Sequence, residues 1–114
     1  MNLYKVENGF LLGLLNGEAK DLKRIVERSV DASIEKHVPV VKVDGSRVIV
    51  NIGSIEHPMV DEHYIEFVAI KSEKGLQVKY LNPSDSPIVE FELVDDKFIN
   101  AYAYCNLHGL WRNE

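Results

Sequence analysis

The sequence predicts an all-β protein, built as an immunoglobulin-like antiparallel β-sandwich. From Val38 onward the chain divides into short runs of β-branched and aromatic residues, which are typical of strands. Turn-forming residues separate these runs, and no long helical pattern follows residue 31. Several short strands with this spacing favour two packed antiparallel sheets.

The turns between these runs indicate how neighbouring strands connect. Asp44-Gly45 and Lys74-Gly75 are hairpin signals, and Asp95-Asp96-Lys97 is expected to close the last hairpin. Loops that are distant in sequence meet at one end of such a sandwich. The expected strands are Val38–Val43, Arg47–Ile52, Tyr64–Lys71, Leu76–Leu81, Ile88–Leu93 and Phe98–Tyr104.

The first 30 residues are the least regular part of the chain. Leu22, Ile25, Val26 and Val30 recur at helical spacing with charged residues between them, and Asn16-Gly17 forms an expected turn ahead of them. Periodicity alone therefore predicts a short helix in this segment.

Composition limits the class of protein. A chain of 114 residues with 46% hydrophobic residues is long enough for one ordinary domain. The net charge of −5 and the lack of a basic run argue against nucleic-acid and anionic-membrane partners. The longest apolar run, Phe10–Leu15, is too short for a membrane helix and a poor signal peptide. A single cysteine forms no internal disulfide, so we expect a cytoplasmic protein.

The single cysteine and the histidines suggest a metal site. Cys105 and His108 are spaced so that one turn of chain brings a thiolate and an imidazole to the same ion. His37, His57 and His63 lie beside a proline or charged residues, which indicates loops and strand ends. The pattern alone leaves the alternative open that these are exposed loop histidines and a small buried cysteine.

Four segments together resemble the superoxide reductases, the desulfoferrodoxin and neelaredoxin proteins. The resemblance runs in the family's order from about Val30 to Trp111. The segments are Glu35–Pro39 (EKHVP), Gly53–Met59 (GSIEHPM), Glu62–Glu66 (EHYIE) and Cys105–Trp111 (CNLHGLW).

This resemblance implies an enzyme with one mononuclear non-haem iron per chain, cycling between Fe²⁺ and Fe³⁺. It assigns four equatorial imidazoles to His37, His57, His63 and His108, and an axial thiolate to Cys105. In the family, the lysine corresponding to Lys36 attracts superoxide and helps to protonate the product, and the glutamate corresponding to Glu35 binds ferric iron. Both residues have an ordinary alternative as solvated loop charges.

The implied reaction is the one-electron reduction of superoxide to hydrogen peroxide, which detoxifies superoxide in an anaerobe. An external donor such as rubredoxin would supply the electron, and the family implies a homo-oligomer, a dimer or a tetramer. The alternative is a β-sandwich interaction module with a structural zinc. A closed zinc site needs four ligands, whereas five candidates suit iron with an open face.

The N-terminal region departs from the two-iron members of the family, which carry a four-cysteine desulforedoxin domain there. This chain has no cysteine before residue 105. We therefore expect residues 1–33 to be a small N-terminal appendage and linker, a desulforedoxin-like remnant, and residues 34–114 to be the iron-binding β-sandwich domain. The resemblance favours a β-rich appendage over the helix that periodicity predicts.

Overall fold

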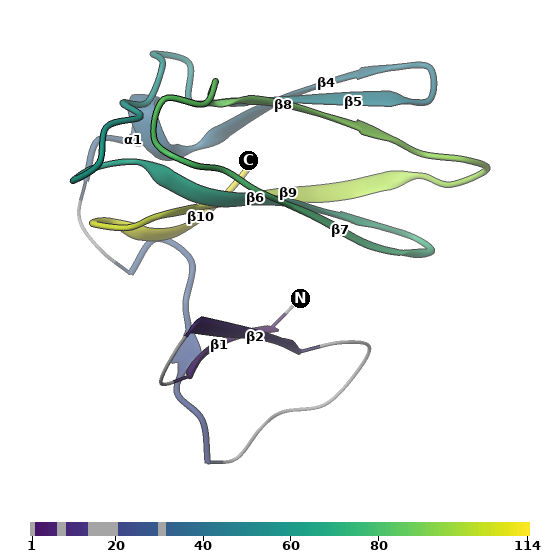
Figure 1. The fold of residues 1–114 in the computed structure, drawn as a ribbon. Helices are drawn as coiled ribbons and strands as arrows, with labels where there is room; N and C mark the ends of the chain where they lie inside the picture. Colours follow the sequence, from purple (N-terminus) through teal and green to yellow (C-terminus); the bar gives the residue numbers. More distant parts are fainter. Residues whose placement is uncertain (1, 7–8, 14–20, 30–31) are drawn as a thin grey trace.

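Two antiparallel sheets stacked face to face form the body of the chain, and a third, smaller sheet lies beside them (Figure 1). The computed structural model describes residues 2–6, 9–13, 21–29 and 32–114. Its elements are β1 (Asn2–Val6), β2 (Gly9–Gly13), β3 (Arg24–Ile25), α1 (Ile34–His37), β4 (Pro39–Asp44), β5 (Arg47–Ile52), β6 (Ile65–Ser72), β7 (Gly75–Tyr80), β8 (Ile88–Glu92), β9 (Phe98–Cys105) and β10 (Gly109–Arg112).

The sheet order confirms the predicted sandwich. One sheet runs β4-β5-β8 and the other β10-β9-β6-β7, so strands distant in sequence pair at β5–β8 and β6–β9. Each strand predicted from residue 38 onward is present, with ends that differ by at most one residue. Strand β10 was not predicted. Within the described segments no helix is long and apolar enough to cross a bilayer.

The expected hairpins are present at two of the three places. Asp44 pairs with Arg47 across the β4–β5 turn, where Gly45 has a φ of 61°, and Ser72 pairs with Gly75 across the β6–β7 turn. The prediction that residues 95–97 close a hairpin is wrong, because β8 pairs with β5 whereas β9 pairs with β6. This segment carries the chain from one sheet to the other, and a polar turn sequence fits both kinds of connection.

Strand β6 is buried on both faces. Val68 and Ile70 face the core between the two large sheets, whereas Phe67 and Ala69 face the opposite side. Side chains alternate between the faces of a strand, so four consecutive buried residues require a cover on each side. The second cover comes from the N-terminal sheet.

The N-terminal sheet, in the order β2-β1-β3, packs on the outer face of the four-stranded sheet (Figure 1). Leu3 is 1% exposed and shares an apolar cluster with Phe67 and Tyr102. The helix predicted around residues 22–30 is wrong for residues 21–29, because Ile25 pairs with Leu3 in the sheet. Periodicity does not register such a long-range pairing. Val30 and the turn predicted at Asn16-Gly17 lie outside the described residues.

The N-terminal sheet, β2-β1-β3, agrees with the expectation of a β-rich appendage. Its origin as a desulforedoxin remnant, and the division of the chain between residues 33 and 34, stay predictions.

Candidate metal centre

The cysteine and the four histidines lie at one end of the sandwich, in loops and at the ends of elements as predicted. His37 ends α1, His57 and His63 lie between β5 and β6, Cys105 ends β9, and His108 lies in the turn before β10. Strand pairing explains this proximity, because Cys105 pairs with both the first residue of β6 and the first residue of β10. The start of β4 pairs with the end of β5, which brings α1 to the same end (Figure 1).

The four imidazole rings stand at the corners of a rough square. Neighbouring ring centroids are 4.7 Å apart for His37 and His57, 4.6 Å for His57 and His63, 5.1 Å for His63 and His108, and 4.8 Å for His37 and His108. The centroids of His37 and His63 are 6.2 Å apart across the square. Neighbouring rings are inclined by between 77° and 90°. The four rings therefore surround one point.

Two of these rings direct lone pairs at each other. His37 Nδ1 lies 2.7 Å from the Ser33 carbonyl and His57 Nδ1 lies 2.7 Å from the Pro58 carbonyl, so in the neutral rings both Nδ1 atoms carry the proton. Their Nε2 atoms, which then carry lone pairs, are 3.2 Å apart. Two acceptors at that distance repel each other unless a cation lies near them.

The remaining donors complete the cluster. His63 Nε2 is buried and has no hydrogen-bond partner in the described part of the chain. His108 Nδ1 lies 3.1 Å from His37 Nε2 and 3.8 Å from Cys105 Sγ. Ligand atoms of His37, His63, Cys105 and His108 all lie within 4.8 Å of one another. His57 is outside that set of four but joins it through its contact with His37.

Burial keeps three of the four imidazoles in the neutral form that binds metals. Burial lowers the pKa of His37, His57 and His63, and that of His57 falls to about 4. These rings are therefore neutral at pH 7. Burial raises the pKa of the Cys105 thiol, and hydrogen bonds from the Leu107 and His108 backbones oppose this rise. A bound cation ionises a coordinating thiol, so metal binding would release a proton.

The low pKa of His57 predicts that the fold loses stability in acid. The pKa falls from its ordinary 6.5 to about 4 on folding, so the unfolded chain takes up the proton first as the pH drops. The contribution is intact above pH 6.5 and is lost towards pH 4, and its full size is about 3 kcal/mol. Urea unfolding of chelator-treated protein should therefore depend less steeply on pH in this range for His57→Asn than for the wild type. Equal slopes would contradict this assignment.

Asn106 links the turn after β9 to the loop before β6 by hydrogen bonds. Its backbone N–H donates to the Tyr64 carbonyl at 3.1 Å, and its side-chain oxygen accepts from the Tyr64 N–H at 2.9 Å. Its side-chain amide donates to the Glu62 carbonyl at 3.1 Å. Because Asn106 follows Cys105 and the other two residues flank His63, these bonds fix the imidazole relative to the thiol.

Trp111 contacts two of the four histidine residues. It is 2% exposed, and its ring lies against His37 with a centroid distance of 4.9 Å and an interplanar angle of 29°. Its indole N–H donates to the His108 carbonyl at 3.0 Å. One buried side chain therefore restrains two of the imidazole-bearing residues.

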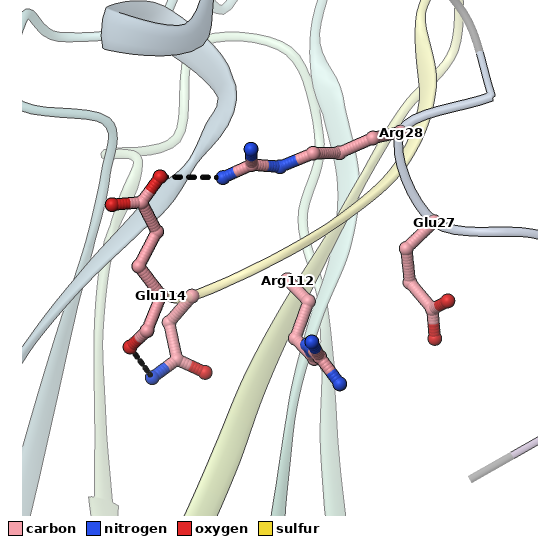
Figure 2. Close-up of a pocket in the computed structure, with 5 residues that line it drawn as sticks. Glu27, Arg28, Arg112 and Glu114 are labelled. Atoms are coloured by element: carbon pink, nitrogen blue, oxygen red, sulfur yellow. Dashed lines mark hydrogen bonds and ion pairs between the residues drawn. The ribbon is translucent and has the colours of Figure 1, made fainter.

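The segment before α1 is tied to β10 beside this tryptophan. The Arg28 N–H donates to the Leu110 carbonyl at 2.8 Å, and the Arg28 guanidinium lies 6.0 Å from the Trp111 ring centroid. Figure 2 shows the ion pair between Arg28 and Glu114. The two charged groups are 2.8 Å apart, and both residues line a hollow of about 330 Å³. The ion pair is exposed and contributes little to stability, so the backbone bond is the firmer link.

Glu35 and Lys36 precede His37 on α1, and both are exposed. A hydrogen bond from the Glu35 backbone N–H to its own carboxylate holds the pKa of that carboxyl below its usual range. Its carboxylate is not among the clustered ligand atoms of the described residues. Burial is the main cause that lowers the pKa of His63. The positive charges of His108 and Lys36 lower this pKa further.

The ligand candidates were found from sequence, whereas several supporting groups were not. The carbonyls of Ser33 and Pro58 orient two imidazoles, and a backbone carbonyl has no sequence signature. Asn106 lies inside the motif at residues 105–111. Its side-chain amide can both donate and accept hydrogen bonds, and this was the sequence signal for a supporting role.

Known proteins resemble this chain in sequence and in structure. The Desulfoferrodoxin family model matches residues 29–114. A desulfoferrodoxin of Clostridium acetobutylicum is 38% identical over 120 residues, covering 98% of this chain and 94% of that protein. The crystal structure of the superoxide reductase from Treponema pallidum has a TM-score of 0.83 and 39% identity, and the match covers 98% of each chain.

The one-iron superoxide reductase from Giardia intestinalis has a TM-score of 0.60 and 32% identity, covering 69% of this chain and 95% of that one. The family model spans every clustered cysteine and histidine and the whole sandwich. The chain therefore belongs to the desulfoferrodoxin family of superoxide reductases.

Proposed function

We propose that this chain reduces superoxide to hydrogen peroxide at one iron ion per chain. The proposed ligands are His37, His57, His63, His108 and Cys105. Each turnover consumes one superoxide, one electron and two protons and releases one hydrogen peroxide, without dioxygen. The family and its superoxide reductase relatives support the activity, and the clustered donors support the ligands.

The observation that carries this proposal is the pair of facing lone pairs on His37 and His57, 3.2 Å apart. Both rings are held in one tautomer by carbonyls behind them, the arrangement that orients metal-binding histidines. The unpartnered Nε2 of His63 is a third donor that a cation would satisfy. The residues therefore fit a metal ion.

The donor set favours iron over a structural zinc. Structural zinc is bound by four ligands in a tetrahedron, whereas this site offers five donors, with the imidazoles in a rough square. Imidazole and thiolate donors both suit iron. The four imidazoles and the thiolate would hold the ion and would leave it able to bind substrate.

Bound iron would supply the redox chemistry, because a ferrous ion gives up one electron, and with one thiolate its net charge of +1 attracts an anion. Burial keeps His37, His57 and His63 neutral, and Cys105 is fully buried on the core side. His63 and His108 are partly exposed, so the opposite face is the one that substrate can reach.

Lys36 is proposed to attract superoxide and to hold a water that supplies a proton. It is exposed on α1 directly beside His37, and its charge contributes to the low pKa of His63. Those two facts support a position near the open face. An ammonium group there would raise the local concentration of a small anion although the whole chain is acidic.

Glu35 is proposed to bind the iron only after oxidation, when the charge at the site has risen. Glu35→Ala should therefore alter the alkaline transition of the oxidised protein's visible spectrum and leave the rate of the reduced protein with superoxide within about twofold of wild type. Spectra across a pH series, together with stopped-flow rates, check this. A large loss of the reduced protein's rate would contradict it.

An external one-electron donor, such as rubredoxin, is proposed to re-reduce the site. We further propose a homo-oligomer, dimer or tetramer, and a cytoplasmic location, which a single free cysteine suits. The net charge of −5 argues against a nucleic-acid partner.

Metal content and a visible spectrum before and after ascorbate test the iron assignment. About one iron per chain, with a thiolate-to-iron band that bleaches on reduction, is the expected result. Zinc in place of iron, or a colourless protein that iron does not restore, would favour the structural zinc module.

A further inference from the structure

The turn after β5 lies in close contact with the backbone of α1. Gly53 is buried, and a Cβ at this position would lie 2.4 Å from the Glu35 carbonyl oxygen, 2.7 Å from the Lys36 carbonyl carbon and 2.9 Å from the Glu35 carbonyl carbon. All three neighbours are backbone atoms. A side chain here could not be accommodated by a rotamer change, so one of the two segments would have to move.

The same turn holds the Glu35 carbonyl with two donors. The Ile55 N–H donates to it at 2.9 Å and the Ser54 hydroxyl at 3.3 Å. The last carbonyls of a helix lack partners within the helix, and α1 ends only two residues later. The turn at residues 53–55 therefore caps α1 and fixes its final peptide groups.

We propose that Gly53 is a positioning residue, which allows the turn at residues 53–55 to hold the Glu35–Lys36 backbone against the metal centre. This inference rests on the proposed function, in which Glu35 and Lys36 act at the open face. Because two donors hold the Glu35 carbonyl, the turn fixes the backbone from which the Glu35 and Lys36 side chains project.

His37 is held by different contacts. Its Nδ1 bonds to the Ser33 carbonyl at 2.7 Å, and its ring lies against Trp111. Loss of the Gly53 contact should therefore displace Glu35 and Lys36 more than the imidazole. The variant is expected to keep its metal and lose the contribution of Lys36.

Gly53→Ala is the direct test. Restoring an ordinary contact of about 3.4 Å to the Glu35 oxygen needs a movement of about 1 Å, since 3.4 minus 2.4 is 1.0. We expect about tenfold slower reaction with superoxide, with iron content and the visible band of the wild type. Gly75→Ala is the matched control, because a Cβ there meets nothing within 4 Å. It should react at the wild-type rate.

The combination with Lys36→Ala shows whether Gly53 acts through this lysine. If it does, Gly53→Ala slows the Lys36→Ala protein by less than about twofold, because the contribution it removes is already absent. If the rate losses of Gly53→Ala and Lys36→Ala multiply in the double variant, Gly53 does not act through Lys36 and the proposal is overturned.

Hydrogen–deuterium exchange of the purified full-length protein gives a readout that does not depend on activity. Peptides containing the Ile55 amide should exchange about tenfold faster in Gly53→Ala than in Gly75→Ala. If Gly53→Ala does not fold, Ser54→Ala takes its place, and it should raise exchange at Ile55 in the same direction. Unchanged exchange with an unchanged rate overturns the inference alone, whereas a wild-type protein that does not consume superoxide overturns the proposed function.

Discussion

Replacing Cys105 with serine is expected to abolish the visible band and to lower the rate of superoxide reduction by more than about a hundredfold. Partners one step removed from a metal typically contribute about 10- to 100-fold, so a direct ligand should contribute more. A serine hydroxyl stays protonated where the thiol ionises, and it does not push electron density onto the metal as a thiolate does.

The buried position of Cys105 requires a control for folding. The side chain is fully buried in the core between the two large sheets, so serine places a hydroxyl among apolar groups at a cost of about 1–3 kcal/mol. Cys105→Ala removes the thiolate without adding a polar group. If both variants fold by circular dichroism and both lose the band and the reaction, the thiolate is responsible. A variant that keeps the band and the reaction would remove Cys105 from the ligand set.

Lys36→Ala is expected to slow the reaction with superoxide by about tenfold and to weaken its dependence on ionic strength. The substrate is a small anion, and the chain as a whole carries a charge of −5, so local positive charge must guide it. Iron content and the visible band should stay unchanged, because the ammonium group of a lysine has no lone pair to give to a metal.

The matched control is Lys74→Ala, which removes the same charge from the β6–β7 turn. Ser72 pairs with Gly75 at that turn, whereas the other end of β6 pairs with Cys105, so Lys74 lies away from the metal centre. Rates measured by pulse radiolysis over a range of salt concentrations should differ between the two variants. If the rates of the two variants depend equally on salt concentration, Lys36 is an ordinary solvated lysine.

The strands of the sandwich were predictable because their apolar residues follow the period of a strand. In β5, Val48, Val50 and Ile52 are buried in alternation with more exposed residues, and the predicted bounds match the structure. The helix predicted near Ile25 failed because the decisive contact, with Leu3, joins residues far apart in sequence. Strand β10 was missed because it is short and begins at a glycine, which reads as a break.

The sequence predicted which cysteine and histidines would be candidate ligands, but it did not predict the groups that support them. Histidine and cysteine are rare enough in this chain for their spacing to be informative. The contact between Gly53 and α1 is made by backbone atoms, so no pair of side chains in the sequence indicates it. The orientation of each imidazole also depends on carbonyl groups, which every residue has.

The yield of hydrogen peroxide from the reduced protein tests the central claim most directly. A known amount of superoxide is added to an excess of ascorbate-reduced protein, and hydrogen peroxide and dioxygen are both measured. Superoxide reduction predicts one hydrogen peroxide for each superoxide and no dioxygen. One hydrogen peroxide for every two superoxides, with dioxygen released, would indicate dismutation and contradict the account, as would a failure to consume superoxide faster than buffer alone.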